Sequence, residues 1–340
     1  MKTAVGRERM QMYRDRVSIV TPVYNGESHL AGMLDSVLAQ TWPNLEMILV
    51  DDGSSDGTIQ VAEGYREAFS RKGIPYEIVK APHKHASGAV NQGLPLVTGE
   101  YLIWPDSDDV LAPESVRKRV EFLKAHPEYE CVRSLSWYFD ASTGERREKG
   151  DEKRGDLSKE ELFWDILESS TFVCCGCYML RSERFFEIYP ERRIPEYPVG
   201  QNFQMLLPFM YRHRCPTLRE ELYGVAVRQD SHSRARLTQE QEERKYLDYE
   251  HLIDDIVQIC GMTDRKSLER IACWKAKRRY SISLKYGRKK QAVRALHTMR
   301  RCGNAGFGRV LKETIWICLV NGWVEEHIYP IYRKLFERTR

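Results

Sequence analysis

The sequence predicts an α/β fold, with a largely parallel, Rossmann-like sheet in the first part of the chain and helices at the end. Four short apolar runs, at residues 16–25, 45–50, 76–80 and 101–104, have the length and composition of buried strands. Amphipathic or capped helical stretches lie between them, and such alternation is typical of parallel α/β sheets. From about residue 240 onward the patterns are helical only.

Each element of the first part has its own local signal. The expected order is strand 16–25, helix 27–40, strand 45–50, helix 58 to about 71, strand 76–80, helix 87–96 and strand 101–104. In the first helix Leu30, Leu34 and Val37 share one face. The turn at residues 51–58 is rich in Gly, Ser and Asp, which give backbone freedom and cap the following helix. We therefore expect two successive strand–turn–helix units.

The strand at residues 101–104 ends in three carboxylates, Asp106, Asp108 and Asp109. Crowded carboxylates raise one another's pKa unless a cation neutralises them. Oxygen ligands of this kind suit Mg²⁺ or Mn²⁺, and ligands of open α/β sheets bind beyond the carboxyl ends of strands. The alternative is a solvated turn that caps the helix beginning near Pro113. On this cluster alone both interpretations stand.

Several classes of protein are excluded by what the sequence lacks. No Gly-x-Gly-x-x-Gly follows the first strand and no Gly-Lys-Ser/Thr loop occurs, which argues against a dinucleotide dehydrogenase or a P-loop enzyme. No run of about 18 apolar residues predicts a membrane span. The nine cysteines lack the spacing of a disulfide framework and indicate a reducing compartment. Cys174, Cys175 and Cys177 have no second ligand pair at zinc spacing, so we expect buried strand cysteines.

The charge of the chain is unevenly distributed. Residues 264–340 contain 20 Lys and Arg against 6 Asp and Glu, whereas residues 1–263 contain 33 against 43. A basic tail on an acidic body indicates an anionic partner, either a lipid surface or a nucleic acid. Residues 310–323 are apolar and aromatic with basic flanks. They are expected either to lie in a membrane interface or to pack on the catalytic domain or a second subunit.

Four motifs resemble, in order and spacing, those of the family 2 glycosyltransferases with the GT-A fold. They are Thr-Pro-Val-Tyr-Asn (21–25), Val-Asp-Asp-Gly-Ser-Ser-Asp-Gly-Thr (50–58), Asn-Gln-Gly (91–93) and the segment from Gly-Glu-Tyr to Asp-Ser-Asp-Asp (99–109). The resemblance implies a mixed sheet with helices on both faces and a C-terminal helical extension. The implied organisation is a disordered leader (1–15), a nucleotide-sugar half (16–130), an acceptor half (131–238) and a basic helical region (239–340).

The resemblance also implies roles for individual residues. Nucleotide-sugar binding would fall to Pro22, Tyr24, Glu27, Asp52, Asn91 and Asp106, with Asp106 on the ribose. Asp108 would hold Mn²⁺ or Mg²⁺, and such an ion neutralises the charge that develops on a departing nucleoside diphosphate. Asp52 could accept a hydrogen bond from a nucleobase N–H, or it could only cap a helix.

One motif departs from the family pattern. Family members usually carry Gly-Glu-Asp before a helix, with a carboxylate that deprotonates the acceptor, whereas this chain has Gly200, Gln201 and Asn202. Amides cannot act as general bases near neutral pH. The base therefore lies elsewhere, or the alignment slips, or the protein is catalytically reduced. Glu196 is the first candidate base and Asp109 the second.

A second segment, residues 227–234, is similar to the one that closes the family's catalytic domain. The resemblance implies that His232 completes the metal shell and that Arg228 or Arg234 faces the diphosphate. A single His is also compatible with a plain surface position. Lys84 and His85, after the third strand, are further candidates for phosphate contact.

The resemblance therefore implies an inverting, metal-dependent glycosyltransferase that moves a sugar from a nucleotide-diphosphate donor to an acceptor hydroxyl. The expected acceptor is a glycan or a lipid-linked molecule in cell-surface polysaccharide or glycoconjugate synthesis. We expect a cytoplasmic protein that contacts the inner face of the membrane through its basic helices and binds no nucleic acid. The alternatives are a catalytically reduced nucleotide-sugar-binding protein and, with less support, a nucleotidyltransferase.

Overall fold

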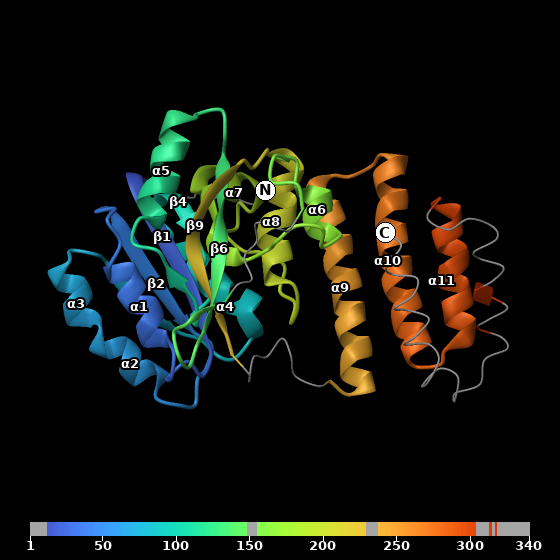
Figure 1. Cartoon of the computed structure of the whole chain (residues 1–340), viewed down its shortest axis with the longest axis horizontal. Coiled ribbons are helices and arrows are strands. Elements are labelled where there is room, and N and C mark those ends of the chain that lie inside the picture. Colours follow the sequence, from blue (N-terminus) through green and yellow to red (C-terminus); the bar gives the residue numbers. More distant parts are fainter. Residues whose placement is uncertain (1–11, 148–154, 229–236, 304–312, 315–316, 318–340) are drawn as a thin grey trace, which may run out of the picture. The chain divides into compact units, whose positions relative to one another are not determined.

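Four parallel strands form one half of a nine-stranded sheet (Figure 1). β1 (Tyr13–Val23) lies between β2 (Leu45–Asp51) and β4 (Gly99–Ile103), and β3 (Tyr76–Lys80) lies outside β2. Every residue of β2 is buried, as expected for a strand covered on both faces. The predicted parallel half of the sheet is therefore confirmed.

Antiparallel pairings make the rest of the sheet mixed. β8 (Tyr178–Arg181) pairs antiparallel with β4, and β6 (Cys131–Asp140) pairs antiparallel with β8. β9 (Thr217–Val227) runs parallel to β6, and the short β5 (Val110–Leu111) is antiparallel to β9. The resulting order is β3-β2-β1-β4-β8-β6-β9-β5, with β7 (Arg146–Arg147) paired to β6. This is the mixed sheet expected from the sequence.

The computed structural model describes residues 12–147, 155–228, 237–303, 313–314 and 317. The chain forms two compact units, Met1–Ala235 and Arg236–Arg340. Residues 1–11 of the expected leader (1–15) lie outside the described part, and so do His232, Arg234 and most of residues 310–323, whereas residues 13–15 of that leader belong to β1.

Helices connect the strands of the first unit. They are α1 (Leu30–Leu38), α2 (Thr58–Gly64), α3 (Arg66–Arg71), α4 (His85–Gly93), α5 (Ser115–Ala125), α6 (Phe163–Leu167), α7 (Ser182–Ile188) and α8 (Gln201–Arg212). α4 packs closely on β1 and β2. The close approach requires glycine at position 93, since an added Cβ would lie 2.6 Å from the Val20 side chain. This contact places the beginning of α4 near the carboxyl ends of those strands.

Two expectations for single elements were wrong. The helix expected over residues 58–71 is divided into α2 and α3 at Tyr65, next to Gly64, a residue of low helix propensity. Cys175 and Cys177, expected in a buried strand, lie instead in a 3₁₀ turn, η3 (Cys175–Cys177), and the strand β8 begins only at Tyr178. These cysteines are therefore buried because they lie in the core, and not because they belong to a strand.

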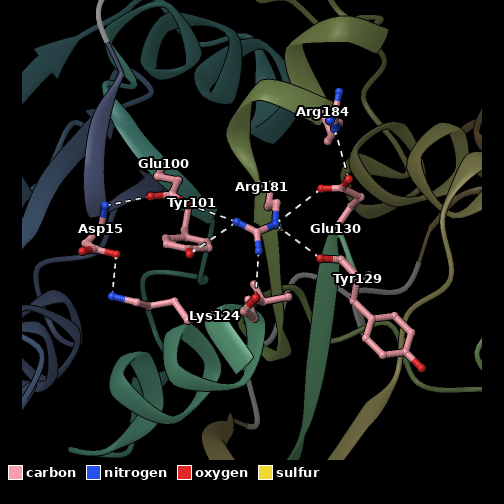
Figure 2. A network of polar contacts seen from close by, with 9 residues as sticks. Asp15, Glu100, Tyr101, Lys124, Tyr129, Glu130, Arg181 and Arg184 are labelled. Carbon is pink, nitrogen blue, oxygen red and sulfur yellow. Dashed lines mark hydrogen bonds and ion pairs between the residues drawn. The ribbon is translucent and has the colours of Figure 1, made fainter. Parts of the chain in front are cut away.

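A network of polar contacts joins the elements at one end of the sheet, opposite the carboxyl ends of β1, β2 and β4 (Figure 2). Arg181 Nη1 lies 3.0 Å from Glu100 Oε1, and its Nη2 donates to the Leu123 carbonyl at 2.8 Å. Its Nε donates to the Tyr129 carbonyl at 3.3 Å. One side chain thus joins β4, β8, α5 and the loop that leads to β6.

The second unit contains three long helices, α9 (Gln239–Cys260), α10 (Arg265–Lys285) and α11 (Lys289–Arg301). A capping box between Thr238 and Gln241 begins α9. The apolar residues that join α10 and α11 are Cys273, Ala276, Leu296 and Met299. Among the described residues, no helix has the length and apolar character required to cross a membrane.

Candidate functional site

Acidic segments follow two strands that flank the same central strand. β2 ends at Asp51, which is in register with Val23 of β1, and β4 ends at Ile103, one strand away on the other side of β1. Since the three strands are parallel, the residues after them lie along one edge of the sheet. This is the edge at which ligands bind in open α/β sheets.

Asp52 joins the end of β2 to the segment before α4. Its side chain is buried, with 4 % of its surface exposed. Oδ1 accepts the backbone N–H of Lys84 at 2.7 Å, and Oδ2 lies 2.8 Å from Nδ1 of His83. The His83 ring lies 4.3 Å from the ring of Tyr24, between centroids, so Asp52, His83 and Tyr24 form one cluster.

His83 was not among the residues selected from the sequence. The available signal was its position directly before Lys84, in the segment that follows β3. Its partners, Tyr24 and Asp52, are distant along the chain, so their contact with His83 became visible only in the fold.

Glu27 binds the turn that follows β2. Its Oε2 accepts the backbone N–H of Gly57 at 2.9 Å, while its own N–H donates to Asp56 at 3.1 Å. Pro22 lies within β1, in register with Val50. Two of the sequence motifs, at residues 21–25 and 50–58, are therefore adjacent in space.

The acidic loop after β4 is held by Tyr223 of β9. The backbone N–H of Asp106 donates to Tyr223 Oη at 3.1 Å, and Tyr223 donates to Oδ2 of Asp109 at 2.6 Å. Oδ1 of Asp109 accepts the N–H of Ala226 at 2.8 Å. The Tyr223 ring fits only because residue 176 is glycine, whose added Cβ would lie 2.0 Å from that ring. Asp109 is thus bound to β9 through both oxygens.

Burial perturbs the ionisation of this loop. Burial and then the neighbouring Asp108 raise the pKa of Asp106 to about 6, although a hydrogen bond from Cys175 acts in the opposite direction. Burial followed by the charges of Asp106 and Asp108 raises the pKa of Asp109 well above its usual range, despite the hydrogen bonds from Tyr223 and Ala226. A cation beside these carboxylates would restore their ionised forms.

Asp108 is the most accessible of the three carboxylates, with 37 % of its side chain exposed. Arg228 Nη1 lies 4.0 Å from its Oδ2 and donates to Nδ1 of His29 at 2.5 Å. In the described part of the chain, no group of three or more His, Cys, Asp and Glu side chains converges as a complete metal site. The oxygen donors Asp106 and Asp108 nevertheless fit a divalent cation that takes its other ligands from phosphate and water.

Asn91 and Glu196 belong to a second cluster, at α4. Asn91 donates to the carbonyl of Ile194 at 2.9 Å and accepts the N–H of the same residue at 2.8 Å. Glu196 accepts hydrogen bonds from Arg193 at 2.5 Å and from Asn91 at 3.3 Å, and Lys84 Nζ lies 3.8 Å away. Burial raises the pKa of Glu196, but the hydrogen bonds from Asn91 and Arg193 outweigh it and the net shift is downward.

The two amides that replace the family carboxylates begin α8. Gly200 adopts φ 69°, a left-handed conformation that favours glycine, and the helix starts at Gln201. Asn202 accepts from Trp104 Nε1 at 3.3 Å and donates to the Val173 carbonyl at 3.0 Å. Gln201 Nε2 is buried with no hydrogen-bond partner among the described residues. Trp104 lies directly after β4, so these amides are adjacent to the acidic loop.

Residues 18–189, half of the chain, match the family model described as glycosyl transferase family 2. The chain belongs to glycosyl transferase family 2. The matched residues include the second part of β1, from residue 18, together with β2, β4 and the acidic segments that follow β2 and β4. The sequence-based assignment to this family is therefore confirmed, and the protein is a glycosyltransferase.

Two curated relatives of this family 2 member are proteins of Bacillus subtilis. It is 29% identical over 226 residues to the putative glycosyltransferase EpsE of Bacillus subtilis, covering 66% of this chain and 77% of that protein. It is also 29% identical over 180 residues to the putative teichuronic acid biosynthesis glycosyltransferase TuaG of the same species, covering 53% and 67%.

Solved structures show the same fold. TarS of S. aureus, residues 1–349 in complex with UDP-GlcNAc, matches with a TM-score of 0.59 and 18% identity over 84% of this chain and 81% of that one. The mannosyltransferase PcManGT of Pyrobaculum calidifontis, in complex with GDP-Man and Mn²⁺, matches with a TM-score of 0.53 and 17% identity over 96% and 88%. These similarities confirm the GT-A-like fold of the family 2 member.

Proposed function

We propose that the protein transfers a sugar, with inversion, from a nucleotide-diphosphate donor to an acceptor hydroxyl. The observation that carries the proposal is the position of Asp52 and of the Asp106–Asp109 loop after β2 and β4, on either side of β1 and at the same end of the sheet. Asp52 lies beside the aromatic rings of Tyr24 and His83. Asp108, in the loop after β4, lies beside Arg228. This separation suits a ligand with an aromatic base at one end and a diphosphate at the other.

The donor would be bound by residues of both clusters. Tyr24 supplies an aromatic surface for the nucleobase, and Asp52, oriented by His83 and the Lys84 N–H, accepts a hydrogen bond from a base N–H. Pro22 of β1, Glu27, which binds the turn after β2, and Asn91 of α4 would contribute to the donor-binding surface. Asp106 would bind the ribose, and Asp108, with His232 as a further proposed ligand, would hold Mn²⁺ or Mg²⁺. Such a cation, when bound, neutralises the charge that develops on the departing diphosphate.

Glu196 is our proposed base. Its lowered pKa keeps the carboxylate ionised at neutral pH, and Arg193 and Asn91 fix its orientation. It would take the proton from the acceptor hydroxyl as the oxygen attacks the anomeric carbon. The bond from that carbon to the nucleoside diphosphate breaks on the opposite side, which inverts the configuration. Asp109 is the weaker candidate, because both of its oxygens are bound to β9.

The acceptor would be a glycan or a lipid-linked molecule used in cell-surface polysaccharide synthesis. This part of the proposal rests on the relatives, one of which is named for teichuronic acid biosynthesis. Work on such an acceptor would place the protein in the cytoplasm, at the inner face of the membrane.

The experiment is a turnover assay with a panel of nucleotide sugars that includes UDP-GlcNAc and GDP-Man, with and without Mn²⁺. Release of nucleoside diphosphate that depends on the cation and on an added glycan acceptor would support the proposal. Tight donor binding without turnover would instead favour a catalytically reduced binding protein, which the amides at Gln201 and Asn202 make the second candidate. Absence of binding to every donor would contradict both.

A further inference from the structure

The outer face of α11 carries a row of basic side chains. Lys290, Arg294, His297 and Arg301 are all exposed, and they recur at intervals of four, three and four residues. This spacing places them on one side of the helix, over a length of about 16 Å at 1.5 Å per residue. The opposite side is buried through Ala292, Ala295, Leu296 and Met299. We call these four basic residues the α11 basic row.

The four side chains of the α11 basic row lack acidic partners among the described residues, unlike several cations of α10 and of the α10–α11 turn. Cations of α10 and of the α10–α11 turn pair with carboxylates of α9. The pairs are Lys275–Asp254, Arg279–Glu250, Lys285–Glu242 and Arg288–Glu243. None of the four side chains of the row has an ion pair or hydrogen bond to a described residue, and α11 itself contains no Asp or Glu.

Although Arg301, in the last turn of α11, suits the helix dipole, the beginning of the row is unfavourable for the helix itself. Lys290 lies in the first turn of α11, where a positive charge opposes the helix dipole. Neighbouring cations at i and i+4, such as Lys290 and Arg294, repel each other. Helix stability therefore does not account for the row, whereas an external anionic surface would.

We propose that the α11 basic row binds the anionic headgroups of a phospholipid bilayer. A straight row of exposed cations on one helix can approach a flat anionic surface with all its members at once. The apolar side of α11 is already buried against α10, so the contact is electrostatic and lies at the headgroups. This inference is independent of the proposed donor site and goes beyond it.

The test is co-sedimentation of the full-length protein with vesicles of phosphatidylcholine containing phosphatidylserine. The variant is Lys290→Gln, Arg294→Gln and Arg301→Gln combined. Its matched control is Lys72→Gln, Lys245→Gln and Lys266→Gln, which removes three exposed positive charges elsewhere. Circular dichroism and thermal unfolding establish that both triple variants are folded.

We expect the parent and the control to bind these vesicles at low salt, and the row variant to bind at least about tenfold more weakly. Binding of the parent should fall as salt rises and should be absent with pure phosphatidylcholine. Equal binding by the row variant and the control would overturn the proposal, and so would failure of the parent to bind at low salt. Tighter binding of the parent to duplex DNA than to the vesicles at equal salt would also overturn it.

Discussion

The Asp52 carboxylate combines burial with two fixed neighbours, the Lys84 N–H and the His83 ring. We expect Asp52→Ala to weaken the binding of nucleoside diphosphates and of their sugars to the same extent. One lost charge-assisted hydrogen bond corresponds to about 1.5–3 kcal/mol, or roughly ten- to a hundredfold in affinity. Calorimetric titration measures this loss. Glu77→Ala, which removes an exposed carboxylate from neighbouring β3, is the control and should bind as the parent does. Unchanged affinity in Asp52→Ala would reduce Asp52 to a structural role.

Glu196 is the proposed base that removes the proton from the acceptor hydroxyl. Glu196→Gln keeps its size and its contacts with Arg193 and Asn91 but removes its basicity. Turnover should fall on the order of 10²- to 10⁴-fold, with donor affinity nearly unchanged. Because the pKa of Glu196 is lowered from 4.5, its protonation limits the rate only below that pH.

The pH profile and a second variant make this prediction specific. The loss of activity that protonation of Glu196 causes at acid pH should be missing from the residual activity of Glu196→Gln. Asn202→Asp in the same background places a carboxylate beside Trp104 and should restore part of the turnover. Transfer by Glu196→Gln at the parent rate would show that the base lies elsewhere.

Among the elements, β8 pairs with β4 through the backbone, and Arg181 adds side-chain contacts to β4, to α5 and to the segment between α5 and β6. We expect Arg181→Met to lower the free energy of unfolding by about 2–3 kcal/mol, because it leaves the Leu123 and Tyr129 carbonyls and Glu100 without this donor. Arg184→Met is the matched control. Arg184 pairs with Glu130 and Glu187 at a more exposed position, so its loss should amount to about 1 kcal/mol or less.

Chemical denaturation of the two variants checks this difference. Donor affinity at low temperature should be unchanged in both, because Arg181 lies at the edge of the sheet opposite the acidic loop. Equal stability of Arg181→Met and Arg184→Met would contradict the central role assigned to Arg181 in the network of Figure 2.

Elements with strong local signals were predictable from the sequence. β2 is a short run buried on both faces, and its Asp-Asp-Gly turn marks its end, so both its range and its acidic edge were expected. The conformation of Cys175–Cys177 was not predictable, because an apolar run does not distinguish a strand from a buried 3₁₀ turn. The division between α2 and α3 was missed for a similar reason, since one Gly is often tolerated within a helix.

The site was predictable only as far as its residues adjoin strand ends. Asp52, Asp106 and Asp108 were selected because they lie in acidic segments after apolar runs and because these segments resemble the family motifs. Tyr223 is more than a hundred positions from Asp106 along the chain, and nothing local to it indicates that it holds the acidic loop. The engagement of Asp109 with Ala226 was invisible for the same reason. Such long-range partners are set by strand order, which one sequence does not specify.

At the scale of the whole molecule, the two units carry different chemistry. The first unit holds the carboxylates and aromatic residues expected to bind the donor. The second holds the excess of basic charge, with the α11 basic row exposed. We therefore expect variants of the row to alter membrane binding without altering donor affinity in solution. Calorimetric titration with a nucleotide sugar should therefore give the same affinity for the row variant as for the parent.

The central claim is that the carboxylates after β2 and β4 bind a nucleoside diphosphate together with a divalent cation. The most direct measurement is calorimetric titration of UDP and GDP into the parent and into Asp108→Asn, each with and without Mn²⁺. We expect the parent to bind one of the two nucleotides more tightly with Mn²⁺, and Asp108→Asn to lose this dependence while its unfolding temperature is retained. Binding by Asp108→Asn with the affinity and Mn²⁺ dependence of the parent would contradict the account.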